Sequence, residues 1–441
     1  MPEAYPPYLN PAMETLSRDA LHALQTSRLL TRLPLAYANA PLLRETWKEA
    51  RIRPGDIHSL EDFRAGAPSL EKEMVRRFRD ERGDPFGGMA VRLDDSYAIH
   101  SSSGTTGSPT FLPVNDRDVE TFGESLARHF WCAGLRPGDV FSLSGGLYLR
   151  PIQALYLAAR RIGARVALTD WVDPARILHT LRHLAPKVHA FLTPPMVVEF
   201  REALAADGAD PETVFGETQS FIWGGDVLTP KTRDAIEGEW GTEVFELSGT
   251  ADLGYMMMEC EAHDGLHAHD DLWFVELVEP GTTRPVAEGG RGEFLFTSLM
   301  DSSLAFFRWR SEDIGTLRTE RCACGRTSSR LTFLGRVGYR AMIRGTMIFP
   351  ADIQLVMETL PEADHGLFQI IKDAENMERL KLRVGYRPGE LADPVPVGRR
   401  IAAALEDRLG LPAEVCFVDA DTLLALGPPH KIPRIHDVRG A

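Results

Sequence analysis

The feature that most constrains the fold is an alternation of strand-like and helix-like segments between residues 139 and 247. Short apolar runs alternate there with stretches whose apolar residues have helical spacing. Strands joined by helices of this length form parallel sheets with helices on both faces, so we predict an α/β fold. The expected strands are 139–143, 164–168, 188–193, 219–223 and 243–247, and the expected helices are 152–161, 174–184 and 229–240.

The pattern changes after Leu272. Two segments, 273–278 and 292–297, alternate apolar with polar residues around a turn rich in proline and glycine, which is typical of antiparallel β structure. A smaller α+β segment of about 100 residues follows Gly335-Arg336. We therefore expect a large N-terminal domain over residues 1–336 and a small C-terminal domain over 337–441.

The first 90 residues carry two different patterns. Apolar residues have helical spacing over 11–50, and turn residues such as Pro54-Gly55-Asp56 interrupt residues 51–90. We expect the first segment to be helical and the second to be rich in loops.

Composition excludes several classes of function. The 441 residues are 44% hydrophobic and 25% charged, with a formal net charge of −14. This charge argues against broad contact with nucleic acid, although a single nucleotide needs only a local positive field. We expect no membrane partner, because no run approaches 18 apolar residues and the first residues do not read as a secretory signal. Five cysteines, an odd number, favour a reducing compartment over a disulfide framework, and the cytoplasm is the expected location.

A stretch rich in serine, threonine and glycine, His100–Thr110, is the first candidate binding site. Glycines let a backbone approach an anion closely, and consecutive amides in such a turn can form an anion-binding nest. The spacing does not match a Walker motif. Composition alone favours a phosphate-binding loop and a polar linker equally. We expect this stretch, Gly224-Gly225-Asp226 and Ser248-Gly249-Thr250 to lie at carboxyl ends of strands, where parallel sheets bind ligands.

Three cysteines and one histidine form a candidate zinc site of the closed, structural kind, because zinc takes four nitrogen or sulfur ligands in a tetrahedron. Gly325 follows the Cys-Ala-Cys pair and frees the backbone to turn its amides toward thiolates. His263 and His269 are rival fourth ligands, and the alternative is three thiols without a metal. Cys132 and Cys416 are expected in the core. The candidate ligands are Cys260, His267, Cys322 and Cys324.

Six stretches together resemble, in the same order, the adenylate-forming superfamily of acyl-CoA synthetases and adenylation domains. The resemblance is strongest to its phenylacetate–CoA ligase branch and runs from about residue 10 to the C-terminus. Pro85-Phe86-Gly87 and the Cys260 and Cys322–Arg326 segments favour this branch. The six stretches are His100–Thr110, Trp223–Asp226, Ser248–Asp252, Arg308–Asp313, Gly335–Gly345, and Lys431 with Arg434.

The resemblance implies that ATP activates a carboxylic acid as an acyl-adenylate, and that the acyl group then passes to coenzyme A. It also implies Mg²⁺ and a C-terminal domain that rotates about a hinge near Gly338. An apolar, aromatic candidate pocket favours an aromatic or arylacetic acid. The alternatives are a stand-alone adenylation enzyme that loads a carrier protein or an amine, and a degenerate, non-catalytic nucleotide-binding relative. A homodimer is left open.

The resemblance also assigns roles to residues. Lys431 would contact the carboxylate and the α-phosphate, Arg336 the ribose or phosphate, Asp313 the ribose hydroxyls and Asp252 the Mg²⁺. The expected contacts to ATP or AMP are Ser102, Ser103, Gly104, Thr105, Thr106, Gly107, Gly224, Gly225, Asp226, Ser248, Gly249, Thr250, Asp313 and Arg336. The expected acyl pocket comprises Phe141, Tyr148, Trp223 and Tyr255, and Met256–Met258 fit this pocket and a plain core equally.

The chain departs from the family pattern at several positions. Ser108 stands where many members carry lysine, Ser248 replaces a tyrosine, and Asp252 replaces a glutamate. The candidate phosphate loop is therefore expected to act through amides and hydroxyls, and to leave phosphate charge to Mg²⁺, Arg336 and Lys431.

Overall fold

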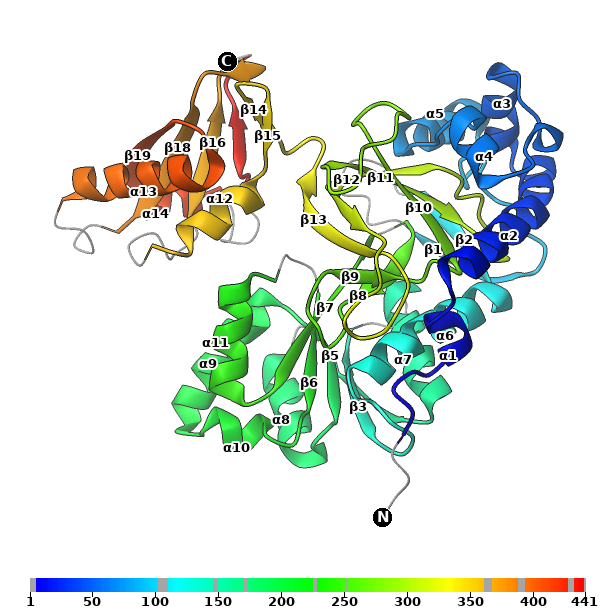
Figure 1. Cartoon of the computed structure of the whole chain (residues 1–441). Coiled ribbons are helices and arrows are strands. Elements are labelled where there is room, and N and C mark those ends of the chain that lie inside the picture. The colour runs from blue at the N-terminus through cyan, green and yellow to red at the C-terminus, as the bar shows by residue number, and fades with distance from the viewer. Residues whose placement is uncertain are drawn as a thin grey trace. The chain divides into compact units, whose positions relative to one another are not determined.

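The computed structural model describes residues 5–101, 110–145, 150–169, 173–224, 228–250, 252–360, 367–387, 393–426 and 432–439. The chain divides into two compact units, which are described separately here. Unit 1 comprises Met1–Leu228, Thr232–Ser311 and Thr316–Thr332, and unit 2 comprises Thr229–Lys231, Glu312–Gly315 and Phe333–Ala441. The expected mixed α/β class is confirmed (Figure 1). The domain boundary at residue 336 stays a prediction.

The largest sheet has 11 strands in the order β10-β11-β12-β13-β9-β8-β7-β6-β5-β3-β4. Strands β3 to β7 pair in parallel, as the alternation of strands and helices predicts. From β7 onward the pairs β7–β8, β8–β9, β9–β13 and β10–β11 are antiparallel. The strands are β3 Val140–Ser144, β4 Arg165–Thr169, β5 Val188–Leu192, β6 Ser220–Trp223, β7 Glu243–Thr250, β8 Gly254–Met258, β9 Leu266–Ala268, β10 Trp273–Val278, β11 Gly292–Ser298, β12 Trp309–Arg318 and β13 Arg330–Arg336.

Helices flank the parallel strands on both sides, with α9 to α11 on one side and α6 and α7 on the other (Figure 1). Helix α8 illustrates why they form: Asp173 caps its first turn, proline stands at its start, and Ile177, Leu178 and Leu181 give it one buried face. That face joins a core with Phe200, Trp223 and Trp240. The helices are α6 Asp116–Cys132, α7 Arg150–Ile162, α8 Pro174–Leu184, α9 Pro194–Asp207, α10 Pro211–Phe215 and α11 Pro230–Trp240.

The N-terminal part of unit 1 is helical beyond the expected range. The expectation that residues 51–90 are rich in loops is wrong over α4 and α5. Helix α5 is mostly charged and buries Val75 alone among its residues, so its apolar pattern is weak, although Gly83 ends it in a left-handed conformation. The elements are α1 Pro11–Glu14, α2 Arg18–Asn39, α3 Pro41–Glu49, the 3-10 turn Pro54–Asp56, α4 Leu60–Gly66 and α5 Lys72–Arg82.

A separate two-stranded sheet flanks the candidate phosphate loop. Strands β1 (Ser96–Ser101) and β2 (Phe111–Asn115) pair antiparallel, with His100 opposite Leu112. The stretch between them therefore connects two antiparallel strands. The expectation that it follows a strand of the parallel sheet is wrong, because the residues on either side of it pair with each other. Residues 102–109 themselves lie outside the described residues.

Unit 2 has a sheet of four strands in the order β19-β18-β16-β20 and a sheet of three in the order β15-β14-β17. Phe368, Leu382, Ile353 and Ile401 meet in its core. Among the described helices of the whole chain, none is long and apolar enough to cross a membrane. The elements are β14 Ala341–Ile343, β15 Thr346–Ile348, α12 Pro350–Met357, β16 Phe368–Lys372, β17 Asn376–Met377, β18 Leu380–Tyr386, α13 Pro394–Leu409, β19 Ala413–Asp419, α14 Ala420–Leu424 and β20 Ile435–Asp437.

Candidate functional site

Two glycines at the carboxyl ends of β6 and β7 have no room for a side chain. A Cβ atom on Gly249 would lie 2.1 Å from the carbonyl oxygen of Gly254. The register of β7 and β8 shifts at this point, between Ser248 and Gly249. A Cβ atom on Gly224 would lie 3.0 Å from Cε2 of Phe191. Both predicted nucleotide-binding turns therefore depend on close backbone approach, which only glycine permits without rearrangement.

Asp252, the predicted magnesium ligand, forms an ion pair with Lys72. The Lys72 Nζ lies 3.0 Å from Oδ2 of Asp252, and the Asp252 side chain is 12% exposed. Lys72 is the first residue of α5. The sequence did not single out Lys72, because residues 51–90 were expected to be rich in loops. Gly83, which ends α5, is the residue that could have indicated the helix.

Asp313 on β12 and Arg336 on β13 are brought together. The Arg336 Nε donates to Oδ1 of Asp313 at 3.2 Å. The Asp313 side chain is 15% exposed and that of Arg336 is 46% exposed. Glu312, next to Asp313, has a φ of +64°, and its carbonyl oxygen accepts from the amide of Val337 at 2.8 Å. The structure thus pairs the two residues that the resemblance assigns to the ribose and phosphate of ATP.

The three described residues of the expected acyl pocket differ in burial. Phe141 is completely buried, and its ring lies 4.8 Å from that of Phe130 on α6. Trp223 is 2% exposed and belongs to the core beside α8 and α9. Tyr255 is half-buried, and desolvation raises the pKa of its phenol. Met256–Met258 are buried, which suits the plain-core interpretation.

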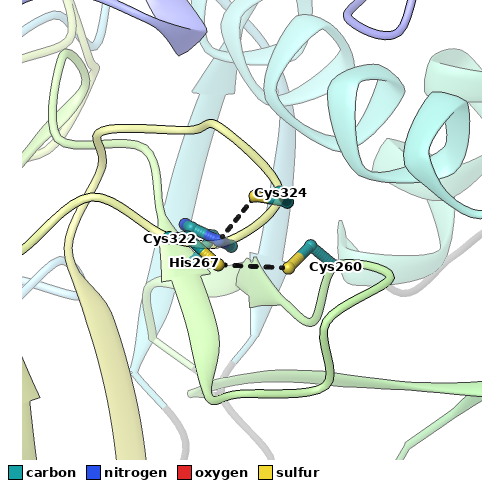
Figure 2. A group of neighbouring side chains, drawn as sticks. All are labelled: Cys260, His267, Cys322 and Cys324. Carbon is teal, nitrogen blue, oxygen red and sulfur yellow. Dashed lines mark hydrogen bonds between the residues drawn. The ribbon is translucent and has the colours of Figure 1, made fainter.

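The four expected metal ligands converge at one point in unit 1 (Figure 2). Their ligand atoms all lie within 4.8 Å of one another. The Sγ atoms of Cys260 and Cys322 are 3.7 Å apart, and Sγ of Cys324 lies 3.5 Å from Nε2 of His267. A tetrahedral zinc ion with Zn–S near 2.3 Å and Zn–N near 2.05 Å places two sulfurs about 3.75 Å apart and a sulfur and a nitrogen about 3.55 Å apart. The two distances in the structure agree with that geometry.

Groups around the cluster hold its ligands in place. The amide of Ala262 donates to Sγ of Cys260 and that of Arg326 to Sγ of Cys324, both at 3.4 Å. Nδ1 of His267 lies 2.9 Å from Oγ of Ser328, which leaves Nε2 facing the thiols. The hydrogen bond between the Cys260 and Cys324 thiols raises the pKa of Cys260 and lowers the pKa of Cys324.

The rival ligands have other partners. His263 pairs with Glu243 and Glu259 at 3.2 and 3.3 Å. His269 lies 2.9 Å from the carbonyl oxygen of Ser125, and its ring stacks on His129. The structure therefore selects His267 from the three histidines that the sequence left open.

The two remaining cysteines differ from the expectation. Cys416 is exposed and Cys132 is only half-buried. The expectation that Cys416 lies in the core is wrong, because its neighbours Val415 and Phe417 pack against the core and successive side chains of a strand point to opposite faces.

Several predicted site residues cannot be placed. They lie outside the described part of the chain, and their roles stay predictions. They are Ser102, Ser103, Gly104, Thr105, Thr106, Gly107, Tyr148, Gly225, Asp226 and Lys431.

Comparison with known proteins finds similarity to coenzyme A ligases, both in sequence and in structure. No family model matches the chain. The chain is similar to the phenylacetate-coenzyme A ligase of Pseudomonas putida, with 30% identity over 347 residues, 78% of this chain and 76% of that protein. It is 28% identical to the phenylacetate-coenzyme A ligase of Thermus thermophilus over 446 residues, 96% of each protein. A crystal structure of 2-hydroxyisobutyryl-CoA ligase in the postadenylation state, with R3-HIB-AMP, has a TM-score of 0.83 and 24% identity and covers 100% of this chain and 94% of that chain. This last likeness shows a shared fold.

Proposed function

The chain belongs to the phenylacetate–CoA ligase family, and we propose that it activates an aromatic or arylacetic acid with ATP and transfers the acyl group to coenzyme A. The relatives named phenylacetate-coenzyme A ligase support the choice of acid and acceptor. The observation that carries the proposal is the pairing of Asp313 with Arg336 at 3.2 Å, since the resemblance assigns both residues to the nucleotide.

The first half-reaction joins two anions. A carboxylate oxygen of the acid attacks the α-phosphorus of ATP, and the bond to the pyrophosphate oxygen breaks. Cations must balance the charge that gathers at the phosphates, and fixed cations do so without reorganising during the reaction. We assign this task to Arg336 and to Lys431, and Asp313 holds the ribose in place.

The resemblance implies a magnesium ion, and Asp252 fits its requirements. Magnesium prefers oxygen ligands from one or two carboxylates together with substrate phosphates. The Asp252 carboxylate is nearly buried and already has a cationic partner in Lys72. Asp252 would hold the ion, which supplies positive charge to the phosphates.

In the second half-reaction a thiol attacks the acyl carbon, a thioester bond forms, and AMP leaves. We propose coenzyme A as this thiol on the strength of the relatives' names. A carrier-protein thiol or an amine is the competing acceptor, and a direct assay separates the three. None of the five described cysteines forms a disulfide, which suits the reducing cytoplasm that we propose as the location.

We propose that the cysteine–histidine cluster holds a structural zinc ion. A zinc ion held by all four of these ligands would have no open position for a substrate. The turn that carries Cys324 also holds the N-terminal segment, because the Tyr8 hydroxyl donates to the Cys324 carbonyl oxygen and Arg326 pairs with Glu14, both at 2.8 Å. The ion would thus join β9, this turn and the chain's first helix.

The test of the ligase function is pyrophosphate exchange into ATP over a panel of aromatic, arylacetic and aliphatic acids. We expect exchange that depends on an aromatic or arylacetic acid, and release of AMP with thioester formation when coenzyme A is added. Parallel reactions with phosphopantetheinylated carrier protein and with simple amines identify the acceptor. Lack of exchange with every acid would refute the proposal in favour of a non-catalytic relative.

A further inference from the structure

Phe191 has a backbone conformation that phenylalanine rarely adopts. Its φ is +80°, in the left-handed region that glycine favours. Residues held there are strained and persist where the surrounding structure or function requires them. Phe191 lies near the carboxyl end of β5 and is 9% exposed.

The strain coincides with a break in strand pairing. In the parallel pair of β5 and β6, Ala190 lies opposite Ile222 and Leu192 lies opposite Trp223. Phe191 is therefore the extra residue of a bulge. Such irregularities change the direction of a side chain and occur often next to active sites.

The bulge places the Phe191 ring between two predicted site residues. The ring centroid lies 5.6 Å from that of Tyr255, at an interplanar angle of 57°. The Phe191 ring also contacts Gly224: a Cβ atom added to Gly224 would lie 3.0 Å from Cε2 of the ring. Tyr255 belongs to the expected acyl pocket, and Gly224 belongs to the expected nucleotide turn. The ring thus lies where the acid and the nucleotide must meet for adenylation.

We infer that Phe191 is a specificity-determining residue that limits the size of the acyl group, and that the strained bulge fixes its ring in this position. This inference rests on the proposed ligase function. An apolar ring beside a half-buried tyrosine suits an aryl acid, since aromatic rings pack well at offset or edge-to-face angles. A smaller side chain at residue 191 leaves room for a larger acid.

The first test compares Phe191→Leu and Phe191→Ala with the wild type. The assay measures kcat/KM in pyrophosphate exchange for phenylacetic acid and for the larger 2-naphthylacetic acid. We expect the ratio of the two values to shift about tenfold or more toward 2-naphthylacetic acid, the range for a change of pocket size. The control is Phe200→Leu, a fully buried phenylalanine on α9, which should lower stability and leave the ratio unchanged.

A second test examines the contact itself. Gly224→Ala should reduce exchange, because its Cβ meets the Phe191 ring. Adding Phe191→Leu to Gly224→Ala should restore part of the loss, so the two effects should not add. If the wild type is active, two results would overturn the role of Phe191 and leave the ligase function standing. One is an unchanged ratio of the two acids in the Phe191 variants, and the other is additive effects in the double variant. A wild type that is inactive with every acid would overturn the ligase function and this inference together.

Discussion

Removal of the proposed zinc ligand Cys260 should destabilise unit 1, and the length of the ring that the metal closes sets the size of the loss. A metal ion in the cluster closes a ring between His267 and Cys324, which are 57 residues apart. A cross-link over a ring of this length stabilises a fold by about 4 kcal/mol. With an unfolding entropy of about 2.1 cal/mol/K per residue over the roughly 330 residues of unit 1, this corresponds to a fall in Tm of about 6 °C.

The assay for this prediction is thermal unfolding of wild type and Cys260→Ser, with metal analysis of both. We expect about one zinc ion per wild-type chain and none in the variant. A strong chelator should lower the Tm of the wild type by about the same 6 °C and leave that of the variant unchanged. Cys416→Ser is the matched control, because that cysteine is exposed and lies outside the cluster. Wild-type chain without zinc, or equal Tm values for Cys260→Ser and Cys416→Ser, would refute the metal site.

Two further predictions concern catalysis and pH. Lys431→Ala should abolish pyrophosphate exchange and leave thioester formation from preformed acyl-adenylate largely intact, and equal loss in both assays would contradict the role of Lys431. Burial lowers the pKa of His189 to about 3, so the unfolded chain binds a proton below about pH 6.5 that the folded chain does not. Stability is therefore lost as pH falls, by about 2 kcal/mol from this residue between pH 7.5 and pH 5. Urea unfolding at both pH values should show a smaller loss for His189→Gln, and an equal loss would contradict this origin.

The sequence predicted the parts of the site that depend on local chemistry. The Cys-Ala-Cys-Gly turn and the order of its partners were enough to name four residues whose ligand atoms converge. The sequence named His267 but could not exclude His263, because the two glutamates that hold His263, Glu243 and Glu259, are brought near it by the tertiary structure. The alternation of strands and helices likewise predicted β3 to β7, since each segment carries its own apolar pattern.

The features that the sequence missed arise where tertiary contacts override local pattern. Helix α5 has too few apolar residues to stand out, and its Lys72 gains meaning only through Asp252. The bulge at Phe191 leaves no mark in the sequence, because all five residues of β5 are buried and four of them, including Phe191, are apolar. Both features lie beside predicted site residues, where local rules are expected to fail.

Each of the two units contains an ion pair that involves a carboxylate assigned to a ligand by the resemblance. Lys72 pairs with Asp252 and Arg336 with Asp313, so each cation is balanced by a carboxylate that the resemblance assigns to a ligand. Binding of ATP with Mg²⁺ would exchange these partners: the carboxylates turn to the metal and the ribose, and the cations turn to the phosphates. The charge of Asp252 would stay balanced in this exchange, which matters because its carboxylate is nearly buried and an unpaired buried charge is costly.

This exchange predicts opposite effects of one substitution, Lys72→Met, on two ligands. Loss of the ammonium group frees Asp252, so the Mg²⁺ concentration for half-maximal pyrophosphate exchange should fall. The same loss removes a cation from the phosphates, so the KM for ATP should rise, by about tenfold for one charge-assisted contact. Asp252→Asn is the matched control and should raise the Mg²⁺ requirement instead. If Lys72→Met leaves the Mg²⁺ requirement unchanged, Lys72 only stabilises the fold, and the exchange of partners at Asp252 does not occur.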